Sequence, residues 1–200
     1  MRRTILCLAG ALLFSSFSRA QEIAPKSFWN AQIYPVRHFE GEFYAGATLP
    51  FGGVDGTKAH MGPAMGLELR YNFAQKPFDL GLLIDITTAV HQQFAGTYTL
   101  TQSNRTCTLG LICDWNFAQG RKVNPYAGLG VGVGFHNVLN DWIDPYGDQT
   151  ATFPTLIPRI GVELFSHLRV GLSSHITARG YDNVQLSIGV VLGGRPKKSR

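Results

Sequence analysis

Four glycines alternate with apolar residues in the stretch PYAGLGVGVGF, which begins at Pro125, and glycine-rich segments of this kind can bind phosphate groups. The dinucleotide-binding fingerprint needs a third glycine three residues after the second, but Val133 occupies that position. The Walker motif needs Lys and then Ser or Thr directly after its last glycine, where Phe135 and His136 stand. The stretch therefore matches neither motif, and its period of two predicts a β-strand with one apolar face and one nearly bare face.

Other residue types that could bind a ligand lie in segments expected to form one rim of the molecule. His60, His91 and His136 could supply metal ligands, but nothing in the sequence fixes their spacing. The segment NDWIDPYGD, residues 140–148, resembles a calcium loop that lacks its closing Glu. Its Pro-Tyr-Gly turn is equally typical of an ordinary polar surface loop. We therefore expect no metal ion and no cofactor.

The amino terminus, MRRTILCLAGALLFSSFSRA, combines basic Arg2 and Arg3 with an apolar stretch and small residues before Gln21. We interpret residues 1–20 as a secretory signal peptide that is cleaved after Ala20. Three basic residues leave with it, so fifteen Lys and Arg then face thirteen Asp and Glu. Four of those fifteen lie in the tail at 195–200, RPKKSR, and we therefore expect no nucleic-acid-binding surface.

Two cysteines remain outside the signal peptide, Cys107 and Cys113. If both lie on one extended strand, six residues place them ~20 Å apart, which is too far for a disulfide. We expect them to be two small apolar residues that face the same way.

Eight segments have a two-residue period, and none has the pattern of a helix. They are residues 39–49, 63–73, 77–88, 107–117, 125–135, 158–165, 168–179 and 183–194. We therefore predict an all-β fold, an eight-stranded antiparallel up-and-down barrel over residues 39–194. Residues 21–38 would form a segment before the barrel, and residues 195–200 a basic tail after it.

The connections between these segments differ in length. Short connections follow the second, fourth and sixth segments, and two of them begin with the same sequence, NFAQ. Long connections follow the first, third and fifth segments, at residues 50–60, 91–105 and 137–152. Short turns on one rim and long loops on the other are typical of transmembrane barrels, and the prediction is therefore a transmembrane β-barrel.

The face opposite the apolar rows indicates which side of the barrel meets lipid. It contains many glycines and charges of both signs in near balance, which suits a narrow, crowded lumen better than a surface in water. The expected lumen charge network consists of Glu40, Glu42, Glu68, Arg70, Asp79, Asp85, Asp114, Arg159, Glu163, Arg169 and His175.

Aromatic residues gather beside the short turns, where an interfacial girdle is expected. They are Tyr71, Phe73, Phe78, Trp115, Phe117, Tyr126 and Phe165. A secreted, soluble lipocalin-like barrel that binds a ligand is the alternative interpretation, and it requires the apolar rows to face inward.

The signal peptide, the stretch PYAGLGVGVGF, the short turns with flanking aromatics and the last strand resemble the small outer-membrane β-barrel proteins. These have an eight-stranded domain like that of outer-membrane protein A. The resemblance implies the outer membrane of a Gram-negative bacterium, with membrane lipid as a partner and a periplasmic carboxyl terminus. Ser187, Gly189 and Leu192 match the family's signal for the barrel-assembly machinery, although the family often ends on an aromatic residue.

The resemblance also implies a structural or adhesion-type surface role, with a possible extracellular partner bound by the long loops. Eight strands leave a lumen that side chains fill, so we expect no free-diffusion pore. Lipid A deacylases, which are barrels of this class, carry a His-x-Ser pair that His175-Ile176-Thr177 loosely resembles. Here His175 would face the lumen, and no Asp or Glu follows it in the last strand. A lipid A-modifying enzyme is therefore the weaker alternative, and we expect no enzymatic activity.

Overall fold

Each of the eight segments of two-residue period corresponds to a β-strand of the structure, which confirms the expected all-β fold. The computed structural model describes residues 36–51, 58–73, 76–140, 149–177 and 181–193. Within these ranges no helix is long and apolar enough to cross a membrane. The expected signal peptide, most of the pre-barrel segment, the calcium-like loop at 141–148 and the basic tail fall outside the described residues.

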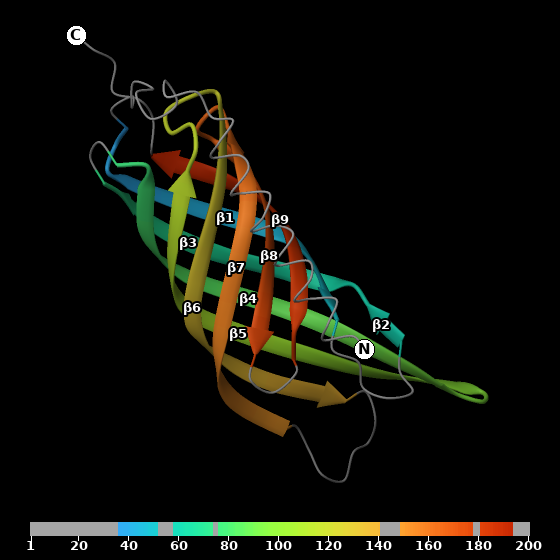
Figure 1. Cartoon of the computed structure of the whole chain (residues 1–200). Helices are drawn as coiled ribbons and strands as arrows, with labels where there is room; N and C mark the ends of the chain where they lie inside the picture. The colour runs from blue at the N-terminus through green and yellow to red at the C-terminus, as the bar shows by residue number, and fades with distance from the viewer. Residues whose placement is uncertain (1–35, 52–57, 74–75, 141–148, 178–180, 194–200) are drawn as a thin grey trace, which may run out of the picture. The chain divides into compact units, whose positions relative to one another are not determined.

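The strands close into a ring of eight, which confirms the expected fold (Figure 1). The strands are β1 (Phe39–Pro50), β2 (Lys58–His60), β3 (Gly62–Asn72), β4 (Phe78–Ala95), β5 (Tyr98–Asn116), β6 (Val123–Asn140), β7 (Gln149–Leu164), β8 (Leu168–Thr177) and β9 (Asn183–Gly193). Neighbours follow the order β4-β3-β1-β9-β8-β7-β6-β5, and pairing of β4 with β5 closes the ring. All pairs are antiparallel. Short β2 lies outside this ring and pairs with the far end of β4.

Side chains alternate strictly between the inside and the outside of the barrel, as in β3, where buried and exposed residues alternate along the whole strand. The exterior is apolar: Leu69 is 65% exposed and Leu111 is 52% exposed. The interior is mostly polar and contains many glycines. A Cβ atom at Gly128 would collide with the carboxylate of Asp114, so the bare face of the fifth predicted strand leaves room for charged neighbours. This arrangement is the reverse of a soluble lipocalin-like barrel.

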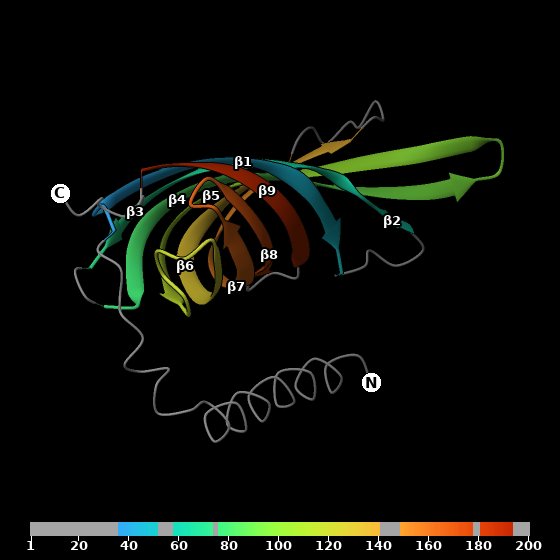
Figure 2. The same cartoon turned by 90° about the horizontal axis from the view of Figure 1, so that it is seen from above.

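The segment 91–105 was expected to be a long loop, and that expectation is wrong. The β4 and β5 strands continue through it as a hairpin and remain paired up to Ala95 and Tyr98. Gly96, with a φ of 67°, occupies the first of the two turn residues, where a two-residue hairpin requires positive φ. Thr and Tyr have high strand propensity, so the run YTLT, from Tyr98 to Thr101, extends the ladder. The hairpin continues past the neighbouring strands in both views (Figures 1 and 2).

Two further long loops are also partly strand. Lys58–His60, in the first of them, forms β2. Residues 137–140 and 149–152, in the third, extend β6 and β7, so that Asn137 pairs with Thr150. The sequence pattern therefore underestimates strand length at this end of the barrel, because polar residues at a rim can form strand ladders without an apolar row.

The short-turn rim carries a row of touching aromatic rings. Their centroids lie 5.2 Å apart for Tyr71 and Phe73, 5.0 Å for Phe73 and Phe78, and 6.4 Å for Phe78 and Trp115. Tyr126 does not belong to this girdle, contrary to expectation: it is 4% exposed and points into the lumen. Tyr126 lies two residues before Gly128, so its side chain is on the same, inward face of β6 as the row of glycines.

The apolar exterior predicts that a charge at mid-height is costly in lipid. Leu111→Arg is expected to lower the free energy of unfolding by ~2–4 kcal/mol, because the arginine would face the hydrocarbon. Thr99→Arg, near the tip of the β4–β5 hairpin, is the control and should change it by less than ~0.5 kcal/mol. Denaturant unfolding of barrels refolded in phospholipid vesicles measures both. Equal, small effects would contradict a lipid-facing exterior.

Candidate functional site

The barrel interior contains the charged residues singled out from the sequence. All eleven residues of the expected lumen network are at most 8% exposed. They come from β1, β3, β4, β5, β7 and β8, and each lies on the inward-facing row of its strand.

Arg70, on β3, is a centre of this network. Its side chain is fully buried, and its guanidinium lies 3.2 Å from the carboxylate of Glu40, 2.7 Å from that of Glu42 and 2.9 Å from that of Glu68. The register explains this arrangement, since β1 places Glu40 directly opposite Arg70 and Glu42 directly opposite Glu68. One guanidinium thus neutralises carboxylates from two adjacent strands.

Arg159 and Arg169, from β7 and β8, extend the network across the lumen. Arg159 donates two hydrogen bonds to Glu68, at 2.7 and 3.0 Å, and its Nε lies 3.3 Å from Asp114. Arg169 donates to the other oxygen of Asp114 and lies 3.7 Å from Glu42. Bidentate pairing of this kind fixes the geometry of a guanidinium as well as its charge.

These contacts form a closed ring in which cations and anions alternate. Five strands on different sides of the barrel contribute to it, so the ring spans the lumen. Its members, in order around the ring, are Arg70, Glu68, Arg159, Asp114, Arg169 and Glu42. We call this set the lumen ring.

Tyr126 covers one side of the lumen ring. The guanidinium carbon of Arg169 lies 3.5 Å from the centroid of its aromatic ring, and that of Arg159 lies 5.6 Å away. Cation–π contacts of this kind are strongest where water is excluded. The inward parity of position 126 could have identified this residue, but its place beside a short turn suggested the girdle instead.

The lumen charges are not near balance, contrary to expectation. In the described part of the chain, seven buried carboxylates face only three buried guanidiniums. Among the described residues, neither Asp79 nor Glu163 has an arginine or lysine within ion-pair distance. Asp79 instead accepts a hydrogen bond of 2.8 Å from Asn116 and lies directly opposite Asp114 on the adjacent strand.

A second cluster lies deeper in the barrel, around Asp85 of β4. Its carboxylate accepts hydrogen bonds from the hydroxyl of Tyr44 and, at 3.2 Å, from the amide of Gln185, and it lies 3.4 Å from Nε2 of His175. His175 therefore has an acidic partner, which comes from β4 and not from the last strand, where the sequence has no Asp or Glu. The two-residue period predicted that the side chains of Asp85 and His175 face the lumen. It does not show which strands are neighbours, so it could not predict that these two residues pair.

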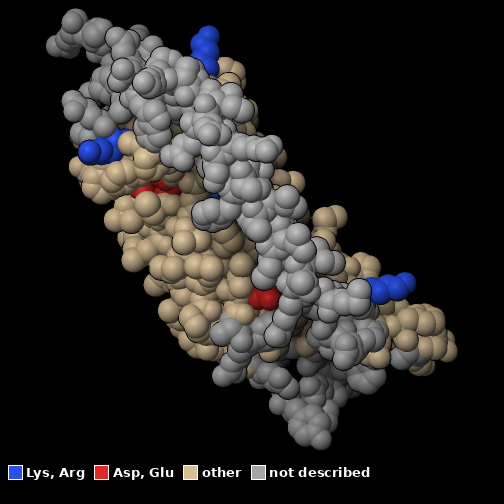
Figure 3. All heavy atoms as spheres, viewed as in Figure 1, with Lys and Arg blue, Asp and Glu red and all other residues tan. Residues whose placement is uncertain are grey.

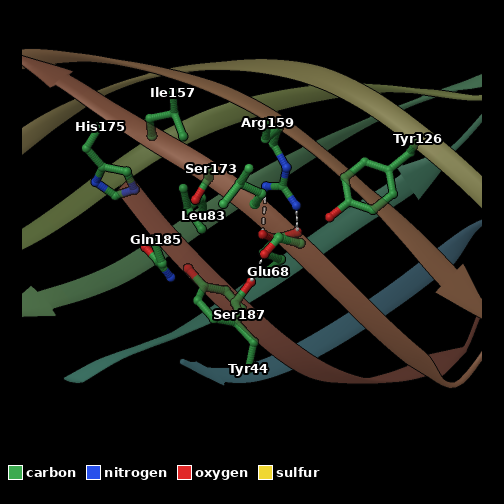
Figure 4. Close-up of a pocket in the computed structure, with 12 residues that line it drawn as sticks. Tyr44, Glu68, Leu83, Tyr126, Ile157, Arg159, Ser173, His175, Gln185 and Ser187 are labelled. Atoms are coloured by element: carbon green, nitrogen blue, oxygen red, sulfur yellow. Dashed lines mark hydrogen bonds and ion pairs between the residues drawn. The ribbon is translucent and has the colours of Figure 1, made fainter. Parts of the chain in front are cut away.

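The cavity beside His175 is far too small for a lipid substrate. It has a volume of about 20 Å³, which is room for about one water molecule, and Ser173 lies on its wall (Figure 4). The hydroxyl of Thr177, expected as the loose counterpart of a nucleophile, instead donates to Asp182 at 3.2 Å.

The end of the lumen opposite the short turns contains an aromatic stack. The ring of His136 lies 3.9 Å from that of Tyr181, which in turn stacks on Phe153 at 5.7 Å. His136 also forms a hydrogen bond of 2.8 Å with Thr106. Over the described part of the chain, no three His, Cys, Asp or Glu side chains come together as a metal site, so the three rim histidines do not form one there.

The closed eight-stranded ring, the apolar exterior with its aromatic girdle, and the ion-paired lumen define a small outer-membrane β-barrel.

No protein-family model and no curated protein sequence matches the chain. Three solved structures of bacterial proteins are similar to it in fold. Neisserial surface protein A is 13% identical with a TM-score of 0.49, and the match covers 78% of this chain and 96% of that one. The N-terminal β-barrel domain of Pseudomonas aeruginosa OprF is 12% identical with a TM-score of 0.45, covering 78% and 99%. Ail, the attachment invasion locus protein of Yersinia pestis, is 12% identical with a TM-score of 0.44, also covering 78% and 99%.

The unequal roles of the lumen carboxylates give a prediction. Asp79→Asn should leave the free energy of unfolding unchanged or raise it, because it removes a like charge opposite Asp114 and keeps an acceptor for Asn116. Asp114→Asn should lower it by ~3–5 kcal/mol, since Arg159 and Arg169 lose their shared anion. Denaturant unfolding in vesicles compares the two variants. Equal losses would mean that the lumen ring is not distinct from the other buried charges.

Proposed function

We propose that the protein is a structural or surface-interaction barrel of adhesion type in the outer membrane of a Gram-negative bacterium, with no free-diffusion pore and no catalytic activity. Membrane lipid surrounds it, the barrel-assembly machinery inserts it, and an extracellular partner binds the end with the long hairpin. The single observation that carries this proposal is the combination of an occluded lumen with a strand hairpin extended beyond the barrel.

The lumen ring supports the proposed absence of a pore. Arg70, Arg159 and Arg169 each bond carboxylates of other strands, so their side chains cross the interior and fill it. Barrels of eight strands have interiors only wide enough for side chains. The inward position of His175, beside a cavity that holds one water molecule, also supports the absence of catalysis on membrane lipid.

The occluded lumen predicts that liposomes containing the refolded protein swell in arabinose no faster than liposomes without protein. A general porin in matched liposomes serves as the positive control. Solute-dependent swelling, faster for smaller sugars, would contradict the proposal of a closed interior.

Among the described residues, the hairpin extends farthest at the end opposite the short turns (Figure 2). Beyond Gln92 and Gln102 its two strands pair only with each other within the part of the chain that the structure describes. Phe94 is 75% exposed and Tyr98 is 73% exposed, and they lie next to the turn. Short turns mark the periplasmic end of outer-membrane barrels, so the hairpin would face the cell exterior. Exposed aromatic side chains frequently dominate the energy of protein interfaces.

An adhesion assay tests the hairpin. Cells of a non-adherent laboratory strain that produce the protein should bind a cultured epithelial monolayer better than cells carrying the empty vector. Phe94→Ser combined with Tyr98→Ser should reduce the bound cells by at least about fivefold, because the interface loses both aromatic anchors. Met61→Ser is the matched control, since Met61 is 72% exposed at the same end of the barrel but outside the hairpin.

The amount of folded barrel in the membrane is compared between variants by the shift in gel mobility between unboiled and boiled membrane fractions. Adhesion equal to that of the vector control would contradict the adhesion-type role and leave the structural role. Unchanged adhesion of the double variant would exclude the hairpin as the binding element.

A further inference from the structure

The short-turn end of the barrel has exposed positive charges and no exposed negative ones among its described residues. Arg37, Lys76, Arg121 and Lys122 are all exposed there. Figure 3 shows Lys and Arg atoms protruding toward the ends of one flank, with small patches of Asp and Glu atoms among the other side chains. Seven of the eight described carboxylates are buried in the lumen. The eighth, Asp182, lies at the opposite end, where it accepts a hydrogen bond from Thr177. These four cationic side chains therefore have no exposed carboxylate beside them among the described residues, and they can bind an anion at the surface.

A shallow, open apolar hollow lies on the exterior near the same end. Phe78 and Trp115 form one side and Leu129 another. Its floor is low because Ala127, an outward-facing residue, lies between the much larger Trp115 and Ile160 of the two neighbouring strands. Its lining also includes Cys113, which forms no disulfide, and the backbone of Gly128.

The basic turn between β5 and β6 shortly precedes Ala127, Gly128 and Leu129, which line this hollow, in the sequence. Lys122 precedes Ala127 by five residues, which corresponds to about 16 Å along a strand. One leaflet of a bilayer contributes about 15 Å of hydrocarbon, so a phosphate at the turn would let an acyl chain reach the hollow. The turn is held in place, because the amide of Arg121 bonds the carbonyl of Ala118 at 3.0 Å and Lys122 accepts from the amide of Phe165 at 2.7 Å.

We propose that this surface is a binding site for an anionic phospholipid of the periplasmic leaflet. Arg121 and Lys122 bind the phosphate-bearing headgroup, and one acyl chain lies in the hollow between Trp115 and Leu129. Charge complementarity selects the anionic headgroup, while the apolar lining selects a lipid over a free phosphate. The assignment of the lipid to the periplasmic leaflet rests on the membrane orientation proposed above. The binding site itself does not depend on that orientation or on adhesion through the hairpin.

Native mass spectrometry of the detergent-solubilised, folded barrel tests the site. The probes are phosphatidylglycerol and phosphatidylethanolamine with identical acyl chains, and phosphatidylglycerol is expected to bind more tightly. Arg121→Gln combined with Lys122→Gln should weaken phosphatidylglycerol binding about 25-fold, since each basic group near a membrane surface contributes about fivefold. Lys122→Gln alone should weaken it about fivefold. The control, Lys58→Gln with Arg105→Gln, removes the same charge from residues far from this turn and should leave binding unchanged.

Ala127→Leu tests the hollow. It should weaken binding of both lipids about tenfold if the new side chain displaces two methylene groups of the acyl chain. Ala45→Leu, an exterior position of β1, is the control and should have no effect. Gel mobility with and without boiling verifies that each variant is a folded barrel. Equal weakening by the two glutamine pairs, or unchanged binding in Ala127→Leu, would overturn the proposal, whereas the adhesion and swelling assays do not depend on it.

Discussion

Burying charge inside a narrow barrel is costly unless each charge has a partner, and this constraint shapes the rest of the structure. The lumen ring meets it with three guanidiniums and three carboxylates whose charges alternate around the lumen. Guanidinium groups suit this role because their planar fork can bond two anions at once, as Arg159 does with Glu68 and Asp114. The side chains that neutralise one another are also the side chains that fill the interior.

The glycines and the exterior both follow from that interior. Gly189 illustrates the first point, because a Cβ there would collide with the carboxylate of Glu42, a member of the lumen ring. Since polar and charged groups occupy one row of every strand, the apolar row must face outward, where only lipid can cover it. The largest departure from this order is the β4–β5 hairpin, whose tip carries two exposed aromatic rings and lies beyond the ring of strands.

Much of this fold was predictable because a two-residue period determines which face each side chain occupies. The period identified the eight strands and the inward position of Arg70 and Asp85, but it contains no register. The three carboxylates around Arg70, and the pairing of Asp85 with His175, depend on which strands are neighbours and how far they are shifted. Tyr126 was misplaced because its position near a turn outweighed its parity. The hairpin was missed because polar, threonine-rich segments lack the apolar row that marks a strand.

The lumen ring also has a consequence for the order of events during assembly. Its members lie on β1, β3, β5, β7 and β8, so it cannot close until nearly the whole chain is in place. A partly assembled sheet in the membrane would leave guanidinium and carboxylate groups unmatched, which is unfavourable in hydrocarbon. Charge neutralisation therefore comes late in assembly, when the last of these five strands is in place, and it links strands that are distant in the sequence.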